Sequence, residues 1–193
     1  MSSFYEELEK RGEELGMARE EMALYAAKRQ GEFTVEDYRR LPDEVRAELI
    51  DGELIYMEAP GYTHQELIME LSVELVNYIR ANKGSCRVVQ FPLDVQLDCD
   101  DRTMVQPDLC IEILSPSTRK KDCTLKVQKY MNAGVREYWI VDPDKKAVIT
   151  YRFEGEDIPG ISMYTFQDKV PVGIFEGSLE IDFQEILGRL RFC

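Results

Sequence analysis

Two carboxylates and a downstream lysine mark the part of the chain that could do chemistry. Asp108 and Glu112 lie in an otherwise apolar segment that predicts a strand over residues 104–114. An unpaired charge is costly to bury, so a metal ion, a lysine or exposure at a strand end must compensate these carboxylates. Hard oxygen ligands would favour Mg²⁺ or Mn²⁺. The segment is therefore a candidate metal site.

Lys126 belongs to a group of polar residues with helical spacing. Positions i, i+4, i+7 and i+8 of the next predicted helix are Asp122, Lys126, Lys129 and Tyr130. This spacing allows one helical face to present a lysine ammonium beside the carboxylates. Such a lysine could orient or help to deprotonate an attacking water, or stabilise charge in a phosphoryl transition state.

The elements around these residues alternate between strand and helix. The strand over 104–114 is followed by a helix over 120–133, closed by Gly134, and by a strand over 137–141. Residues 147–153 form the hairpin partner of that strand. Trp139 and Ile140 belong to a strand without clean alternation, which is typical of a strand buried on both faces. The order predicts an α/β fold with a mixed central sheet flanked by helices.

The preceding region contains three local signals. Thr34 and Asp37 fit a capping box for a short helix that ends before Pro42. The pair Asp51-Gly52 lies between apolar runs and predicts a hairpin over residues 48–57. Apolar positions at helical spacing predict a helix over 63–81, with His64 in its first turn.

The remaining segments are predicted in less detail. Short strands are expected at 87–91, 94–97, 162–166 and 173–175, with an acidic turn at 98–101 and a helix over 183–189. Residues 4–29 carry sparse apolar positions interrupted by Gly12 and Gly16. We expect residues 1–31 to form a helical N-terminal extension and residues 32–193 to form one domain.

Composition limits the classes of function. The net charge of −13 opposes non-specific binding to nucleic acid, although the basic strip at 119–121, Lys126 and Lys129 could contact phosphates locally. The N-terminus lacks the apolar core of a secretory signal, and no apolar run is long enough to span a membrane. The five cysteines lack zinc-site spacing, so we expect reduced thiols in a cytoplasmic protein.

Several motifs together resemble the Uma-type putative endonuclease family of the PD-(D/E)XK nuclease superfamily. They are the hairpin ELIDGEL at 48–54, a helix that begins near His64, the motif IEILSPST at 111–118, and AGVREYWIVDP at 133–143. The resemblance extends from about residue 34 to residue 187 and implies a restriction-endonuclease-like fold. The implied activity is Mg²⁺- or Mn²⁺-dependent hydrolysis of DNA.

Site residues follow from the resemblance position by position. It makes Asp108 and Glu112 metal-binding carboxylates and Lys126 the catalytic lysine, while Glu48 and His64 match further polar positions of the site. Family members usually have two PD segments on separate strands, whereas this chain has one. In a straight strand the Cα atoms of Asp108 and Glu112 would lie about 13 Å apart, too far to share an ion. A bend, a water bridge or a substitute such as Asp94 or Asp98 would then be needed.

Two classes of function remain open. The first is a metal-dependent DNA endonuclease, which the Asp, Glu and Lys residues favour. The second is a catalytically degenerate member of the fold that acts as a binding or oligomerisation module, which the missing segment and the negative charge favour. A homodimer is expected by analogy with nucleases that cut both strands.

Overall fold

The computed structural model describes residues 28–42, 45–57, 59–90, 107–115, 119–153 and 159–190. The chain divides into two compact units, Met1–Ala59 and Pro60–Cys193, and each is described by itself. The predicted strand at 94–97, the acidic turn at 98–101 and most of the predicted N-terminal extension lie outside the described residues. The boundary expected at residues 31 and 32 stays a prediction.

The N-terminal unit contains a short helix and a hairpin. The helix α3 (Val35–Arg39) begins at Thr34, and the predicted capping box with Asp37 is present. The strands β1 (Ala47–Ile50) and β2 (Glu53–Tyr56) pair in antiparallel fashion around Asp51 and Gly52. Both turn residues have positive φ, 51° and 76°, as a primed turn requires. The predicted helix and hairpin are therefore confirmed.

Residues 28–31 pack within this unit. Lys28 Nζ donates to Asp37 at 2.6 Å, and this hydrogen bond with those from Thr34 lowers the pKa of Asp37 to about 2. The Gln30 side chain donates to the Leu54 carbonyl and accepts from its N–H. Gly31 N donates to Gly52 O at 2.9 Å. Each contact ties the segment to the short helix or the hairpin.

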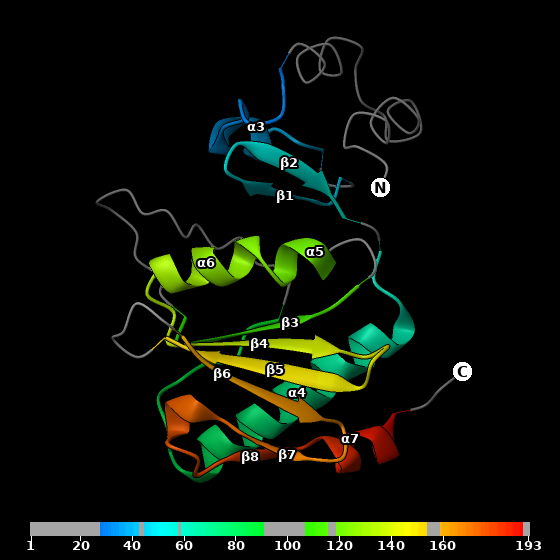
Figure 1. Ribbon diagram of the computed structural model, residues 1–193, viewed down its shortest axis with the longest axis vertical. Coiled ribbons are helices and arrows are strands. Elements are labelled where there is room, and N and C mark those ends of the chain that lie inside the picture. The colour runs from blue at the N-terminus through cyan, green and yellow to red at the C-terminus, as the bar shows by residue number, and fades with distance from the viewer. Residues whose placement is uncertain are drawn as a thin grey trace. The chain divides into compact units, whose positions relative to one another are not determined.

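A four-stranded mixed sheet forms the centre of the C-terminal unit (Figure 1). Its order is β3 (Leu109–Ile113), β4 (Glu137–Asp142), β5 (Ala147–Arg152) and β6 (Gly160–Thr165). β3 and β4 are parallel, whereas the other two pairings are antiparallel. All six residues of β4 are buried. The predicted α/β architecture with a mixed central sheet is confirmed.

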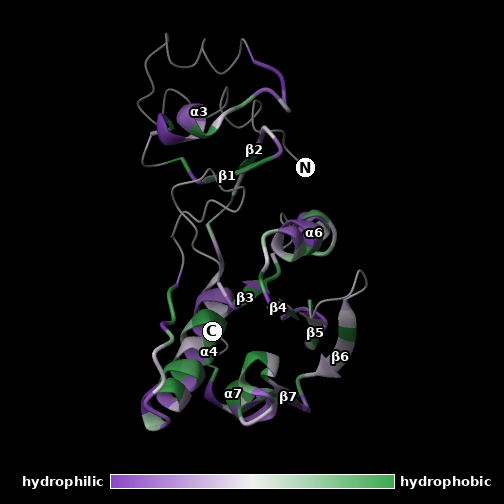
Figure 2. Ribbon diagram, turned by 90° about the vertical axis from the view of Figure 1, so that its left-hand side faces the viewer, coloured by the Kyte–Doolittle hydropathy of each residue, from purple (hydrophilic) through white to green (hydrophobic). Residues whose placement is uncertain are grey.

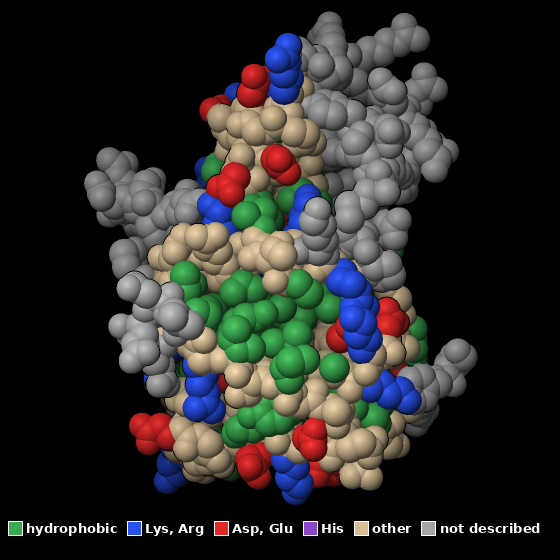
Figure 3. Space-filling view, in the orientation of Figure 1, with side chains coloured by type: hydrophobic (Ala, Val, Ile, Leu, Met, Phe, Trp, Pro, Cys, Tyr) green, Lys and Arg blue, Asp and Glu red, His purple; other side chains and the backbone are tan. Residues whose placement is uncertain are grey.

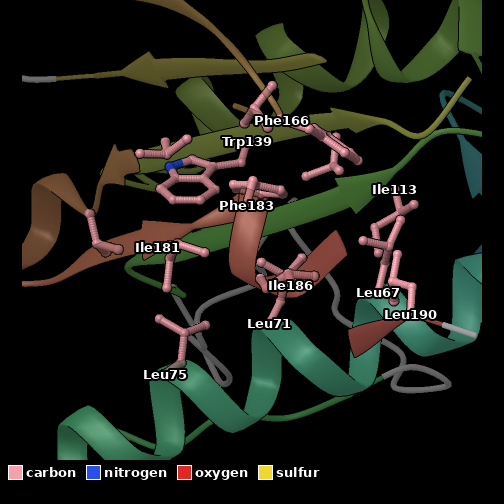
Figure 4. Close-up of a cluster of buried hydrophobic side chains, with 14 residues drawn as sticks. Leu67, Leu71, Leu75, Ile113, Trp139, Phe166, Ile181, Phe183, Ile186 and Leu190 are labelled. Carbon is pink, nitrogen blue, oxygen red and sulfur yellow. The ribbon is translucent and has the colours of Figure 1, made fainter. Parts of the chain in front are cut away.

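One face of the sheet packs on apolar helices. The helix α4 (Tyr62–Ala81) buries Leu67, Leu71 and Leu75 at four-residue spacing, and α7 (Phe183–Arg189) adds Phe183 and Ile186. Figure 4 shows these side chains interlocked with those of the strands. Figure 2 shows α4 and α7 on this side of the sheet and α6 on the other. This face is a core made of hydrophobic side chains.

The opposite face is covered by the connection from β3 to β4. This connection contains α5 (Arg119–Asp122) and α6 (Leu125–Asn132), whereas one helix was predicted over 120–133. The helix breaks at Thr124, where φ is −131° and ψ is −75°. The buried Tyr138 hydroxyl donates to Asp122 O at 3.1 Å, so a tertiary contact satisfies a carbonyl that a continuous helix would bond internally. Gly134 follows α6 with φ 79°, as predicted.

The C-terminal segment differs from the prediction in its strands. β7 (Lys169–Pro171) and β8 (Glu180–Asp182) form a two-stranded sheet, and residues 173–175 form the 3₁₀ helix η1 (Gly173–Phe175) instead of a strand. The N–H groups of Gly173 and Ile174 donate to the buried Glu137 carboxylate at 3.0 and 2.8 Å. These donors are therefore not available to a strand ladder. The predicted helix over 183–189 is confirmed.

The segment after α4 also differs from the prediction. Residues 87–90 have no strand pairing, and Val89 is exposed.

No described helix is long and apolar enough to cross a membrane. The described cysteines, Cys86, Cys110 and Cys123, are free thiols.

Candidate functional site

Glu112 lies beneath α6 near the carboxyl end of β3. Because successive side chains of a strand alternate between faces, Cys110, Glu112 and Leu114 point toward α6. Ile111 and Ile113 pack with the opposite core. Glu112 is paired in register with the buried Ile140 of β4. The alternation thus places a carboxylate within a face that is otherwise apolar, and its side chain is only 17% exposed.

Two side chains of α6 compensate this carboxylate. Lys126 and Tyr130 are one turn apart on the buried side of the helix. The Tyr130 hydroxyl donates to Glu112 Oε1 at 2.8 Å, and Lys126 Nζ donates to the same oxygen at 3.2 Å. The sequence left a metal ion, a lysine or exposure as ways to compensate the charge of a buried carboxylate. At Glu112 the structure has a lysine.

Asp122 supplies a second carboxylate to the lysine. Its Oδ1 lies 3.0 Å from Lys126 Nζ, and the two side chains are 1% and 7% exposed. Lys126 is thus held between Glu112 and Asp122. We call Glu112, Asp122, Lys126 and Tyr130 the buried ion-pair cluster. Removing one partner of such a cluster leaves a buried charge uncompensated.

The surroundings of the cluster fix the protonation of its neighbours. Burial, together with the Glu112 charge, raises the pKa of Tyr130, so its hydroxyl stays a donor at neutral pH. Burial and Glu112 also raise the pKa of Cys110 to about 12. The Cys110 thiol is therefore protonated at neutral pH.

His64 reaches the same end of β3 from α4. Its Nε2 lies 2.9 Å from the carbonyl oxygen of Ile113, and Ile113 is the residue that follows Glu112. Burial lowers the pKa of His64, against the opposing influence of the Ile113 hydrogen bond and the Asp122 charge. A neutral ring that donates from Nε2 leaves Nδ1 as an acceptor, and this buried atom has no hydrogen-bond partner in the part of the chain that the structure describes.

Asp108 is not brought to the cluster. It precedes β3, its side chain is 51% exposed, and it pairs with Arg136 at 3.2 Å. The ladder from Leu109 to Ile113 has unbroken register with β4, so no bulge shortens the strand between Asp108 and Glu112. Their Cα atoms are therefore about 13 Å apart along the strand. Exposure and an arginine compensate Asp108.

Glu48, the remaining residue of the predicted site, belongs to β1 of the N-terminal unit. The arrangement of the C-terminal unit therefore carries no information about its role, which stays a prediction. The same holds for Asp94 and Asp98, which lie outside the described residues.

The donor set for a divalent ion is incomplete in the described residues. No group of three or more His, Cys, Asp or Glu side chains suited to a metal is present among them. Glu112 and Asp122 both contact the Lys126 ammonium, and Asp108 lies toward the other end of β3. The described residues alone do not fit a Mg²⁺ site with two or more protein carboxylates.

The basic strip at the start of α5 is partly engaged within the protein. Arg119 forms ion pairs with Asp142 and with Asp144, the second at 2.9 Å, and thereby joins α5 to the end of β4. The hydrogen bond to Asp142 raises the pKa of Arg119. Arg119 is therefore primarily a structural cation.

Asp122 and Tyr130 are the members of the cluster that the predicted site lacked. Their spacing, one turn before and one turn after Lys126, was noted in the sequence, but neither residue was assigned to the site. The break at Thr124 does not disturb this alignment, because the Lys126 contacts to Asp122 and Glu112 are both present.

Comparison with known proteins gives two matches of different kinds. The sequence matches the family model Uma2, described as putative restriction endonuclease, over residues 35–110 and 92–184. The fold is similar to the crystal structure of a putative nuclease belonging to DUF820 from Anabaena variabilis ATCC 29413. The TM-score is 0.61 at 20% identity, covering 81% of this chain and 98% of that chain. No curated protein matches the sequence.

Proposed function

Because the chain belongs to the Uma2 family of putative restriction endonucleases, we propose that it hydrolyses phosphodiester bonds of DNA at the buried ion-pair cluster. The observation that carries the proposal is the Lys126 ammonium, held between Glu112 and Asp122 at the carboxyl end of β3. Charged groups cost stability when buried, so a buried cluster of this kind is a candidate functional site.

Lys126 is the residue that would act on the phosphate. Hydrolysis adds negative charge to the phosphoryl oxygens in the transition state, and a fixed ammonium stabilises that charge. Glu112 and Asp122 hold the Lys126 ammonium in place, and the Tyr130 hydroxyl holds Glu112. Little reorganisation of these groups is therefore needed during the reaction. Glu112 and Asp122 are therefore positioning groups for Lys126.

A divalent ion is a separate part of the proposal. Mg²⁺ or Mn²⁺ is the cofactor that the family resemblance implies, and such an ion activates water and polarises the phosphate when it is bound. Glu112 is the carboxylate of the cluster that the resemblance assigns as a metal ligand, but the described residues do not complete a site around it. Metal dependence must therefore be measured independently of cleavage.

The experiment uses the full chain with supercoiled, linear duplex and single-stranded DNA. Each DNA form is tested with Mg²⁺, with Mn²⁺ and with a chelator. We expect ion-dependent cleavage of at least one form, and a loss of about 10²- to 10³-fold in rate for Glu112→Ala. Absence of cleavage for every form and ion would overturn the proposal.

Thermal unfolding gives a readout of metal binding that does not depend on activity. A ligand that binds the native state raises the melting temperature. We expect Mn²⁺ to stabilise the parent and to have a smaller effect on Glu112→Ala. Equal stabilisation of both proteins would exclude Glu112 as a ligand.

One observation favours the alternative of a degenerate binding or oligomerisation module. Asp108, the second predicted ligand, is paired with Arg136 and lies toward the far end of β3 from the cluster. If the chain neither cleaves DNA nor gains stability from Mg²⁺ or Mn²⁺, this alternative replaces the nuclease proposal.

A further inference from the structure

The strand β6 is an outer edge of the central sheet. It pairs with β5 through all six residues, Gly160 to Arg152 through Thr165 to Ala147, and no described strand pairs with its other side. Five of its six residues are exposed. An outer strand presents N–H and C=O groups that can pair with another strand. Figure 2 shows β6 at the end of the sheet opposite to β3.

Apolar side chains extend from the sheet onto this edge. Ile161 and Met163 are 57% and 74% exposed. They lie directly opposite Tyr151 and Ile149 of β5, which are partly buried against the cluster of apolar residues beneath α6. Figure 3 shows hydrophobic side chains gathered over β5 and β6 on this face. We call Ile149, Tyr151, Ile161 and Met163 the edge patch.

The edge patch lacks the features that usually prevent strands from pairing. Natural edge strands often carry charged residues, especially lysine, but residues 160–167 contain none. The whole chain carries a net charge of −13, so two copies repel each other over most surfaces. An uncharged, partly apolar strand is a place where two such copies can meet without opposing carboxylates.

The chemistry of the strand favours a second copy over a nucleic acid or a basic partner. An antiparallel strand that meets itself across a twofold axis places uncharged residues opposite uncharged residues. The strand has no cation for phosphate and no anion for a basic protein. We propose that β6 pairs in antiparallel fashion with β6 of a second copy of this chain, so that one continuous sheet runs through both copies and the edge patch is covered.

Sedimentation velocity of the full chain over a wide concentration range tests this pairing. We expect the parent to have twice the chain mass of 22.4 kDa and Met163→Lys to dissociate about tenfold or more readily, because the substitution puts a charged side chain into the covered apolar patch of each copy. Ile161→Lys should have the same effect. A parent that is monomeric at all concentrations, or a Met163→Lys variant as dimeric as the parent, would overturn the pairing.

Met69→Lys is the matched control. Met69 lies on α4, is 56% exposed, and gives the same change of residue and charge away from β6. It should remain dimeric. Circular dichroism must show that the variants are folded. A monomeric parent whose melting temperature falls in Met163→Lys would mean that another part of the same chain covers the patch, which also overturns the proposal. The edge patch does not include Lys126 or Glu112. The result of this experiment therefore does not decide whether the chain cleaves DNA, which the cleavage assays test separately.

Discussion

Helices cover both faces of the central sheet, but the side chains at the two interfaces differ in kind. Beneath α4 and α7 the interface is made of hydrophobic residues, with Trp139 and Phe183 fully buried. Beneath α6 the interface contains Glu112 and Lys126 among tyrosines and aliphatic residues. Both faces belong to the same strands, so alternation along β3 alone decides which face receives the carboxylate.

The difference separates stability from function. The apolar face gains free energy from burial and needs no particular chemistry. The α6 face keeps buried charges that well-packed hydrophobic residues could replace without loss of stability. We infer that the charges beneath α6 are retained for what they do, and that substitutions on the two faces will differ in kind.

The largest loss of stability is expected on the apolar face. Phe183→Ala removes a fully buried ring. The centroid of this ring lies 4.9 Å from that of Phe166 and 6.5 Å from that of Trp139. We expect a loss of about 4 kcal/mol in the free energy of unfolding, measured by urea denaturation, because a cavity replaces the ring. The loss should be similar at acidic and neutral pH. A loss below about 1 kcal/mol would mean that this face is not the main core.

A smaller loss, of a different kind, is expected on the α6 face. Lys126→Met removes the ammonium that lies between Glu112 and Asp122 and leaves two carboxylates without it. We expect a loss of about 3 kcal/mol at neutral pH. Adding Glu112→Gln and Asp122→Asn to the same chain should restore most of it. If the single variant is as stable as the parent, the cluster is not a buried ion-pair network.

The next effect sharpens the comparison within the α6 face. Tyr130→Phe removes only the hydroxyl that donates to Glu112. We expect a loss of about 1.5 kcal/mol, typical of a hydrogen bond to a charged group. Tyr151→Phe, on the same face and with a partly buried ring, is the matched control and should change little. Equal effects of the two substitutions would remove the special role of Tyr130.

The smallest effect concerns pH and His64. Burial holds its pKa below the ordinary value of 6.5, so below that pH the unfolded chain binds a proton that the folded chain does not. Stability should therefore fall as pH falls through 6.5, and His64→Gln should lessen this dependence. His64 is the only histidine, so its ring signals in an NMR titration need no assignment. A titration midpoint above 6.5 would contradict the buried, neutral ring.

The sequence allowed prediction of features that depend on local chemistry. Asp51 and Gly52 define their hairpin because few residues accept positive φ, and the apolar spacing of α4 defines its buried side. Glu112 and Lys126 were identified by their types and by the resemblance. Their direct contact in the structure agrees with the expectation that a lysine could compensate a carboxylate.

The features that were missed depend on contacts between distant segments. The break at Thr124 is accompanied by the Tyr138 hydroxyl on the Asp122 carbonyl, and η1 by the Glu137 carboxylate on Gly173 and Ile174. A Cβ atom at Gly173 would lie 2.5 Å from Arg152 Nε, so only glycine fits there without movement of the arginine side chain. No pattern within a single segment predicts such contacts.

The rate of DNA cleavage by Lys126→Ala, compared with that of Lys145→Ala, tests the central claim most directly. Lys145 is an exposed lysine of the turn between β4 and β5, and its removal causes the same change in net charge. With both variants shown to be folded at the assay temperature, we expect Lys126→Ala to lose about 10²- to 10³-fold in rate and Lys145→Ala to cleave like the parent. A Lys126→Ala variant that cleaves at the parental rate would contradict a function for the buried ion-pair cluster.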